Sequence, residues 1–157
     1  MIILDVEASG LHQDSYPIQI AWVNTENGDE DSFYIKPDEE WHHWDLVAEG
    51  IHNITRKLLD DVGLPANIAA QRLVDRVGKD TTIYTDAPEF DGFWLGRLFD
   101  TVLIPDVSLK VDSVYSLCQY QEEVYQLNEI MSKQDRPHDA LSDCYMIWAA
   151  VKQVIGC

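Results

Sequence analysis

Four carboxylates occupy positions that the surrounding pattern assigns to the interior of a fold. Asp5 and Glu7 stand two apart in a nearly apolar run, so both project from the same face of a strand as Ile3. Asp91 shares a helical stripe with apolar residues at offsets of three, four, seven and eleven, and Asp143 lies on the edge of the apolar stripe of the last helix. Because such acids repel one another and resist burial, the pattern predicts that cations neutralise them.

Oxygen ligands without a His/Cys cluster favour a hard divalent cation over zinc. Two such ions, about 3.5–4 Å apart, clamp the attacking and leaving oxygens of a phosphodiester. A structural interpretation competes at each position taken alone: Asp5 and Glu7 as solvated strand-end acids, Asp91 and Asp143 as helix-start acids favoured by the helix dipole. The four together predict a site for two Mg²⁺ (or Mn²⁺) ions.

The elements that must position these acids are visible in the hydrophobic pattern. Short apolar or β-branched runs predict strands, and apolar residues spaced near 3.6 predict helices. Pro65 fits the first turn of one of these helices. Strands are expected at 2–6, 16–23, 32–35, 81–85 and 107–111, and helices within 41–78, at 90–102 and within 112–155, the last from Asp139. The order predicts an α/β domain whose mixed sheet starts with antiparallel strands.

Composition sets further limits. The 157 residues are 46% hydrophobic and 25% charged, which is typical of one globular domain spanning 1–157 and excludes a fibrous or disordered protein. A net charge of −17 argues against nonspecific adhesion to nucleic acid or to anionic membrane. Without a long apolar stretch or a basic leader the chain is expected to be cytoplasmic, and Cys118, Cys144 and Cys157, which form no CxxC pair, indicate a reducing compartment.

Three motifs in order resemble the DEDDh 3′→5′ exonucleases, the superfamily of the proofreading exonucleases and ribonuclease T. They are Asp5-Val6-Glu7, Phe90-Asp91 and His138-Asp139-Ala140-Leu141-Ser142-Asp143. Further similar segments are Ala8-Ser9-Gly10-Leu11, Pro17-Ile18-Gln19-Ile20 and Ile51-His52-Asn53-Ile54-Thr55. The resemblance therefore covers nearly the whole chain.

The resemblance implies a ribonuclease-H-like fold, a five-stranded mixed sheet flanked by helices, and a role for each acid. Asp5 would bridge two ions, Glu7 and Asp143 would complete the ion that binds the attacking water, and Asp91 would act on the second ion. His138 would be the general base, a task suited to a side chain that titrates near neutrality. Its spacing from Asp143 places His138 at or before the start of the last helix.

The sequence also departs from the family pattern. Asp86 stands where many relatives carry Asn, which makes it a rival to Asp91 as the third acid. Asn53 replaces the glycine of the family's His-Gly-Ile-Thr segment. Ser9, Gly10 and Leu11 are the candidate substrate-binding residues, Leu11 by its match to a position that contacts terminal bases in relatives.

The substrates that fit these observations are short. The only basic pairs near the expected site are Arg56 with Lys57 and Lys133 with Arg136, so long duplex is expected to bind weakly. The leading hypothesis is a two-metal 3′→5′ exonuclease that acts on single-stranded or short-overhang DNA or RNA 3′ ends and releases 5′-mononucleotides. The alternatives are a non-catalytic protein-binding adaptor with the same fold and a ribonuclease-H-like endonuclease. A homodimer is compatible with the sequence.

Overall fold

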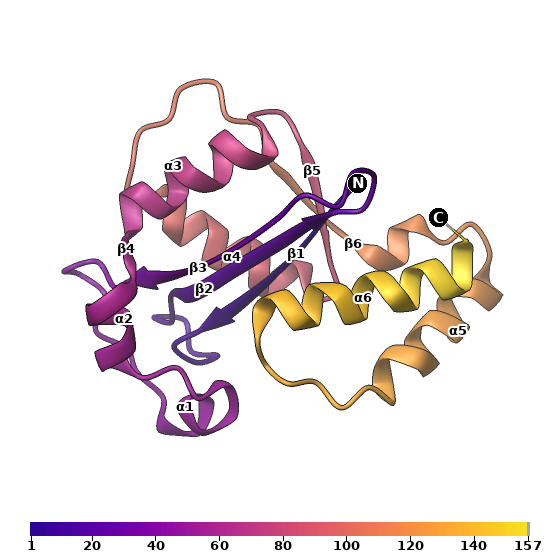
Figure 1. Ribbon diagram of the computed structural model, residues 1–157, viewed down its shortest axis with the longest axis horizontal. Coiled ribbons are helices and arrows are strands. Elements are labelled where there is room, and N and C mark those ends of the chain that lie inside the picture. The colour runs from indigo at the N-terminus through magenta and orange to yellow at the C-terminus, as the bar shows by residue number, and fades with distance from the viewer. Residues whose placement is uncertain (157) are drawn as a thin grey trace.

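The first strand of the chain forms the middle of a mixed sheet. The structure is a computed structural model that describes residues 1–156, so Cys157 lies outside the described residues. The strand order is β4-β3-β2-β1-β5-β6 (Figure 1). β1 pairs antiparallel with β2 and parallel with β5, β3 follows β2 antiparallel, and β4 and β6 are parallel edge strands. The strands are β1 (Ile2–Ala8), β2 (Pro17–Asn24), β3 (Glu30–Lys36), β4 (Leu64–Pro65), β5 (Thr82–Thr85) and β6 (Lys110–Ser113).

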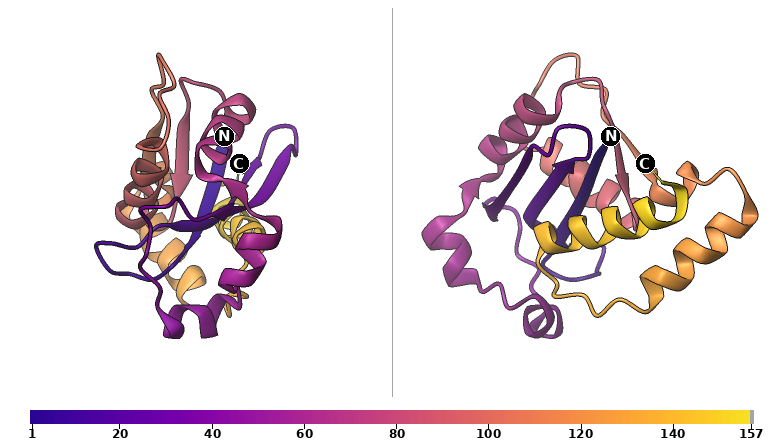
Figure 2. Two further views of the ribbon diagram at one scale, coloured as in Figure 1. Left: turned by 90° about the vertical axis from the view of Figure 1, so that its left-hand side faces the viewer. Right: turned by 45° about the vertical axis from the view of Figure 1, so that its right-hand side comes forward.

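Helices cover both faces of this sheet, as the two views of Figure 2 show. On one face Leu4 and Val6 pack with residues of α2, α3 and α4, and on the other Ile3 packs with residues of α5 and α6. The alternation along β1 therefore assigns Asp5 and Glu7 to the α6 face, as their spacing predicted. The helices are α1 (Leu46–His52), α2 (Arg56–Val62), α3 (Ala66–Val77), α4 (Pro88–Phe99), α5 (Gln121–Ser132), α6 (Ala140–Ile155) and the 3₁₀ turn η1 (Val114–Leu117).

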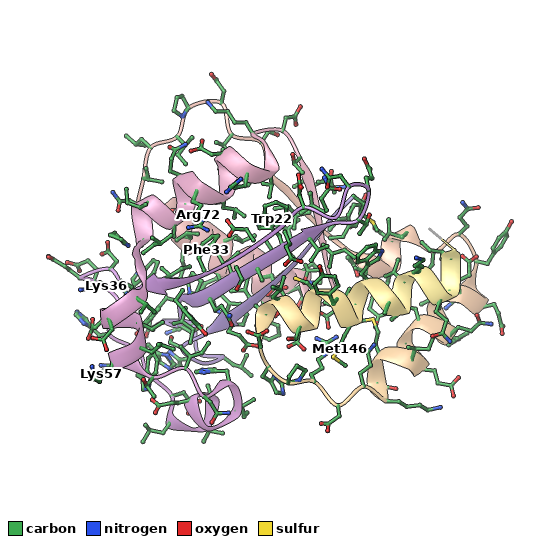
Figure 3. All side chains as sticks on the ribbon, in the orientation of Figure 1. Trp22, Phe33, Lys36, Lys57, Arg72 and Met146 are labelled. Carbon is green, nitrogen blue, oxygen red and sulfur yellow. The ribbon has the colours of Figure 1, made fainter. Side chains whose placement is uncertain are left out.

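α3 is fixed to the sheet by a paired and stacked arginine. The Arg72 guanidinium donates to both carboxylate oxygens of Asp31 on β3, over N–O distances of 2.8 and 2.6 Å. The same group lies over the ring of Phe33, 5.1 Å from its centroid (Figure 3). A two-pronged ion pair combined with stacking fixes the guanidinium more firmly than a single contact would.

The parallel pair at the centre of the sheet is short. β5 pairs with β1 only at Ile2 and Ile3, whereas β2 pairs with β1 along nearly its whole length. Beyond Ile3 the β5 side of β1 therefore has no paired strand among the described residues. α4 begins beside this opening, three residues after β5 ends.

The predicted class of fold is confirmed, with differences in detail. The sheet has six strands because two residues of the segment between α2 and α3 pair with the end of β3, whereas five strands were expected. Pro65 belongs to this β4 and is the N-cap of α3, so its placement in the first turn of the helix was wrong. The last strand is 110–113 instead of 107–111, because pairing with β5 fixes its register. Among residues 1–156, no helix combines the length and the apolarity that a membrane crossing requires.

Gly63 makes the close approach of α2 to the sheet possible. A Cβ at this position would lie 2.4 Å from the carbonyl oxygen of Leu59 and 2.6 Å from the backbone nitrogen of Lys36. We expect Gly63→Ala to lower the free energy of unfolding by about 2 kcal/mol, because two backbone segments must move apart. Gly96→Ala is the matched control: a Cβ there meets nothing within 4 Å and replaces a helical glycine, so it should add roughly 0.5–1 kcal/mol. Urea titration of both variants measures the difference, and equal effects would contradict this account.

Candidate functional site

The acid pair of β1 lies under the first turns of α6. Asp5 is 8% exposed and lies opposite Ala21 in the sheet register, and Glu7 is half-buried opposite Gln19. Neither side chain forms an ion pair with a basic residue in the described part of the chain. Two carboxylates on one buried face without direct cationic partners require compensation from another source.

The third acid, Asp91, comes from α4, which begins just beyond the end of β5. Asp91 stands in the first turn of α4, is 2% exposed and accepts a hydrogen bond from the Thr85 hydroxyl at the end of β5. Asp86, the rival, lies next to Thr85. Oxygens of Asp5, Asp86 and Asp91 all lie within 4.8 Å of one another, so the structure brings both candidates to Asp5. The contact between Thr85 and Asp91 was not predictable from the sequence, because it depends on where α4 begins.

A hydrogen-bonded cap holds the fourth acid and the histidine. Asp139 is the N-cap of α6 and accepts from the Ser142 backbone N–H, as the expected start of this helix requires. The buried Gln19 amide donates to Asp139 over 3.0 Å and accepts from the Ala140 N–H over 3.2 Å, which ties the helix start to β2. Asp143 is thereby placed facing β1. His138 precedes the cap, as predicted, with a left-handed φ of 52°.

These side chains form two groups of oxygen and nitrogen ligands. Atoms of Glu7, His138 and Asp143 lie within 4.8 Å of one another, as do those of Asp5, Asp86 and Asp91. Asp143 is 2% exposed, and its buried Oδ1 has no hydrogen-bond partner within residues 1–156. A buried carboxylate oxygen without a donor is costly unless a cation meets it. The ligand atoms of these two groups, mostly carboxylate oxygens, therefore fit hard divalent cations, for which oxygen is the preferred ligand.

Burial and mutual repulsion raise the pKa of every one of the four acids. Burial is the largest cause throughout; it raises the pKa of Glu7 to about 7, with Asp143 adding to it, and the pKa of Asp91 to about 8. The pKa of Asp5 is raised well above its ordinary value by burial and then by its acidic neighbours, and burial raises that of Asp143. Without cations, part of this cluster is therefore protonated near neutral pH.

Arg136 is the cation that the structure places beside the cluster. Its Nη2 lies 2.6 Å from a carboxylate oxygen of Asp86, and the two side chains are 20% and 18% exposed. The guanidinium lowers the pKa of Glu7, Asp91 and Asp143 and so opposes the effect of burial. The ion pair links the end of β5 to the segment that carries His138.

The other expected phosphate-binding residues are largely engaged elsewhere. Lys57 pairs with Asp61 and Lys133 with Glu129, each over 2.5 Å. Arg56 donates to the backbone oxygen of His42 and lies over the Trp44 ring. In the described part of the chain, Arg56 alone among these four basic residues has no carboxylate partner.

A cavity of about 290 Å³ adjoins the acids. Its lining includes Glu7, His138, Gly10, Leu11, Ile51 and His52. Leu11 is 74% exposed, whereas the Ser9 side chain is buried and bonded to the Tyr16 N–H and His43. Two of the three expected substrate-binding residues thus line the cavity, and the Ser9 hydroxyl is used within the loop.

His52 lines this cavity with a ring that is largely buried. Its Nδ1 accepts from the Ile54 N–H over 3.0 Å, and its Nε2 is buried. Asn53, which follows it, caps α1 in the left-handed conformation at φ 57°. Asparagine tolerates that conformation better than most residues, which explains how it replaces a glycine here.

Comparison with known proteins agrees with this arrangement. The family model described as Exonuclease (RNase_T) matches residues 2–151. E. coli exonuclease I in complex with a dT13 oligonucleotide superposes with a TM-score of 0.77 at 18% identity, covering 98% of this chain and 40% of that one. The zinc-bound form of the E. coli exonuclease I complex with single-stranded DNA gives 0.69 at 16%, covering 97% and 40%. Exonuclease I from Methylocaldum szegediense gives 0.67 at 15%, covering 97% and 40%.

The fold and the acidic cluster are consistent with the family match over residues 2–151. The chain belongs to the exonuclease family whose model it matches, and it spans about two fifths of the length of the exonuclease I structures. A search among curated proteins returned no match.

The raised pKa values determine how stability depends on pH. A group whose pKa is higher in the folded state favours folding below its unfolded value, and this contribution is lost as pH rises through the folded value. Because Glu7 and Asp91 titrate at about 7 and about 8, metal-free protein should lose thermal stability between about pH 5 and pH 8.5. Mg²⁺ or Mn²⁺ should restore the melting temperature, and more so at the higher pH.

Asp5→Asn should raise the metal-free melting temperature at pH 8 and weaken the response to metal, whereas Asp100→Asn, at an exposed position, should do neither. A flat pH profile of the metal-free protein would contradict this prediction.

Loss of the ion pair between Arg136 and Asp86 should lower the stability of the metal-free protein. Arg136→Gln leaves Asp86 without its partner beside three other carboxylates, so we expect the free energy of unfolding at pH 8 without metal to fall by roughly 3 kcal/mol. Lys57→Gln removes an exposed pair with Asp61 and should cost less than about 1 kcal/mol. Urea titration compares them, and a loss in Arg136→Gln no larger than in Lys57→Gln would show that the pair is unimportant.

Proposed function

We propose that the protein is a 3′→5′ exonuclease that uses two divalent cations, Mg²⁺ or Mn²⁺, to release 5′-mononucleotides from 3′ ends. The observation that carries the proposal is the convergence of Asp5, Glu7, Asp91 and Asp143 with His138, including a buried Asp143 oxygen that has no partner. The two ligand groups support a site for two ions. Asp86 is an additional oxygen ligand in the group of Asp5 and Asp91.

The cations, when bound, would polarise the scissile phosphate and stabilise the charge that develops on it. His138 is exposed at the mouth of the cavity and within 4.8 Å of Glu7 and Asp143 ligand atoms, where it can take the proton of the attacking water. The water oxygen forms a bond to phosphorus and the bond to the 3′ oxygen breaks, which leaves a 5′-mononucleotide and a shortened strand. Asp139 and Gln19 hold the start of α6 and so fix the position from which His138 acts.

The adjoining cavity would bind the terminal nucleotide. Leu11 and Ile51 offer exposed apolar surface to a base, and the His52 ring forms part of the cavity wall. Exonuclease I structures hold single-stranded oligonucleotides, which supports a single-stranded substrate here.

The charge distribution favours short, locally held substrates. With a net charge of −17 and three of the four nearby basic side chains engaged by carboxylates, little positive surface is left for a long backbone. We therefore propose single-stranded or short-overhang 3′ ends of DNA or RNA, gripped mainly at the last nucleotides. The comparisons give no support for a homodimer, and we do not propose one.

A non-catalytic adaptor with the same fold is the competing proposal. It leaves unexplained why three buried acids and the half-buried Glu7 gather at a cost to stability, with a histidine at their edge. Absence of cleavage together with capture of a protein partner would favour it.

The direct test is cleavage of 5′-labelled single-stranded DNA and RNA oligonucleotides with Mg²⁺ or Mn²⁺, beside a circular single-stranded DNA. The parent should shorten linear strands stepwise from the 3′ end and leave circles intact. Asp5→Ala should abolish cleavage, and His138→Ala should slow it by about 10²–10⁴-fold, because proton transfer contributes that much. Asp100→Ala serves as the control and should keep parental activity.

Three outcomes would contradict the proposal. Cleavage of circles would identify an endonuclease, and shortening that continues in EDTA would exclude the metal site. No shortening of either polymer by the parent would favour the adaptor.

A further inference from the structure

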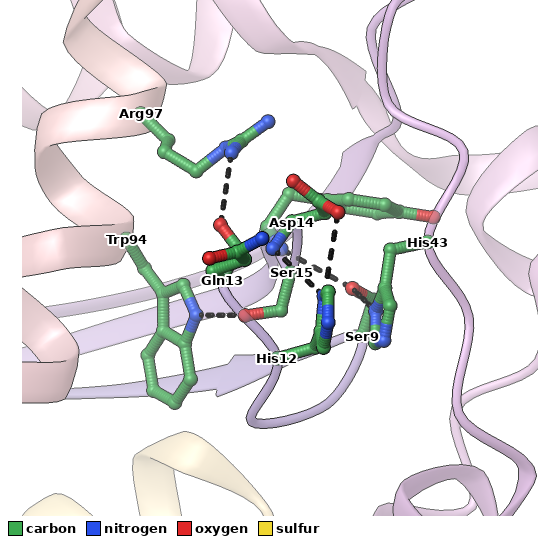
Figure 4. Close-up of polar contacts among 9 residues, drawn as sticks. Ser9, His12, Gln13, Asp14, Ser15, His43, Trp94 and Arg97 are labelled. Atoms are coloured by element: carbon green, nitrogen blue, oxygen red, sulfur yellow. Dashed lines mark hydrogen bonds and ion pairs between the residues drawn. The ribbon is translucent and has the colours of Figure 1, made fainter.

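Three of the five histidines gather outside the acidic cluster. His12, His42 and His43 line a cavity of about 440 Å³ together with Asp14, Glu40 and Arg97. Figure 4 shows His12 and His43 beside the loop that follows β1, with Arg97 reaching toward this loop from α4. None of these six residues takes part in the ligand groups of the acidic cluster.

The rings of His12 and His43 are stacked. Their centroids are 5.3 Å apart and their planes differ by 8°. The His12 side chain is 55% exposed, so part of its ring is accessible to a further flat group. A parallel pair of rings with accessible surface is a platform on which a base can stack.

Contacts inside the loop engage Nδ1 of both rings. His12 Nδ1 lies 3.2 Å from the Asp14 backbone nitrogen and 3.4 Å from Asp14 Oδ2, so Asp14 holds this side of the ring. The Ser9 hydroxyl accepts from the Tyr16 N–H and lies 3.1 Å from His43 Nδ1. Donation of the hydroxyl proton to Nδ1 satisfies both groups and leaves the proton of neutral His43 on Nε2.

This arrangement does not suit a metal ion. Nδ1 of each stacked imidazole is engaged within the loop. Among residues 1–156, these histidines do not converge with a third ligand on one point. The stacked pair thus lacks the set of converging ligands that a metal site requires.

The rim charges favour a neutral ring with amino groups over a phosphate. Asp14 and Glu40 are exposed at the cavity and outnumber Arg97, whose Nη1 donates to the Gln13 carbonyl oxygen over 3.4 Å. Two carboxylates repel a phosphate, but they accept hydrogen bonds from the exocyclic amino groups of adenine, cytosine and guanine. Thymine and uracil have no such group.

The histidine cavity lies directly beside the candidate site. Gly10 and Leu11 line the cavity next to the acids, while His12 and Asp14 of the same loop line this one. Gly10, at φ 147°, has room only for hydrogen, because a Cβ would lie 2.7 Å from His43 Cε1. On α4, Trp94 lines the first cavity and Arg97 the second, about one turn apart. A strand whose 3′ end lies at the acids can therefore pass over the loop and reach the stacked histidines.

We propose that the His12–His43 stack binds a nucleobase of the substrate strand upstream of its 3′ end and prefers bases that carry an exocyclic amino group. The proposal rests on the proposed function, and it adds a second, base-reading subsite to the metal site.

The first experiment compares kcat/KM for a dinucleotide and for longer single-stranded oligonucleotides. His12→Ala should lower kcat/KM about fivefold for oligodeoxyadenylates long enough to reach the stack, which corresponds to ~1 kcal/mol of stacking, and should leave the dinucleotide unchanged. His12→Phe should retain most of the parental rate, because it keeps a ring. The loss should be smaller with oligothymidylate. Tyr125→Ala removes a ring that is 66% exposed on α5 and is the matched control.

An equal loss on the dinucleotide, or an equal loss in Tyr125→Ala, would overturn the proposal, whereas loss confined to longer strands supports it. If the parent cleaves no oligonucleotide of any length, the proposed function fails, and binding then decides about the subsite separately. In EDTA, millimolar oligodeoxyadenylate should shift the imidazole NMR signals of His12 and His43 in the parent, and oligothymidylate should shift them less. Unmoved His12 and His43 signals with both strands would exclude the stack as a base-binding site.

Discussion

Repulsion among carboxylates that the chain places on a buried face is the constraint on which the rest of the site depends. Asp5 and Glu7 cannot leave this face, because the alternation along β1 also buries Leu4 and Val6 on the opposite face. A shift of register by one residue would move the acids to the α4 face and expose those apolar side chains to α6. The carboxylates therefore stay on the buried face, and neighbouring groups reduce the free-energy cost of burying them.

Three neighbouring side chains each reduce part of the free-energy cost of burying these carboxylates. Thr85 donates to Asp91, the Arg136 guanidinium balances Asp86, and Gln19 fixes the helix start from which Asp143 projects. The remaining deficit appears as raised pKa values and as the unpartnered oxygen of Asp143. A site that is strained when empty binds cations more tightly, since binding removes the repulsion as well as forming new contacts. The low stability without metal and the strong affinity for metal that we expect would then have the same cause.

Local patterns in the sequence were sufficient to predict the parts of the fold that depend on periodicity. The apolar run 2–6 predicted β1, with Asp5 and Glu7 on the face of Ile3, and the apolar stripe of 140–151 predicted the last helix, from Asp139. The four acids could be singled out because each interrupts such a pattern. The family resemblance then gave the fold class, which the structure and the comparisons confirm, while the roles of the individual acids and of His138 remain proposals.

Features that depend on contacts between distant segments were not predictable in this way. β4 is only two residues long and exists because Gly63 lets the chain approach β3, and β6 takes its register from β5. The ion pair of Asp86 with Arg136 joins residues fifty positions apart, and the sequence around each residue does not indicate which residue it pairs with. The histidine stack likewise joins two loops whose separate sequences show only ordinary polar residues.

The position of β1 in the sheet has a consequence for how the molecule is made. β1 to β3 pair through short connections and can form early, whereas the face of β1 that carries Asp5 and Glu7 is covered by α6, which a ribosome produces more than a hundred residues later. Asp143 and His138 cannot meet the first two acids until α6 has been synthesised and has docked. A nascent or truncated chain that ends before α6 thus holds only part of the cluster, so synthesis of the last helix is the step that completes the candidate site.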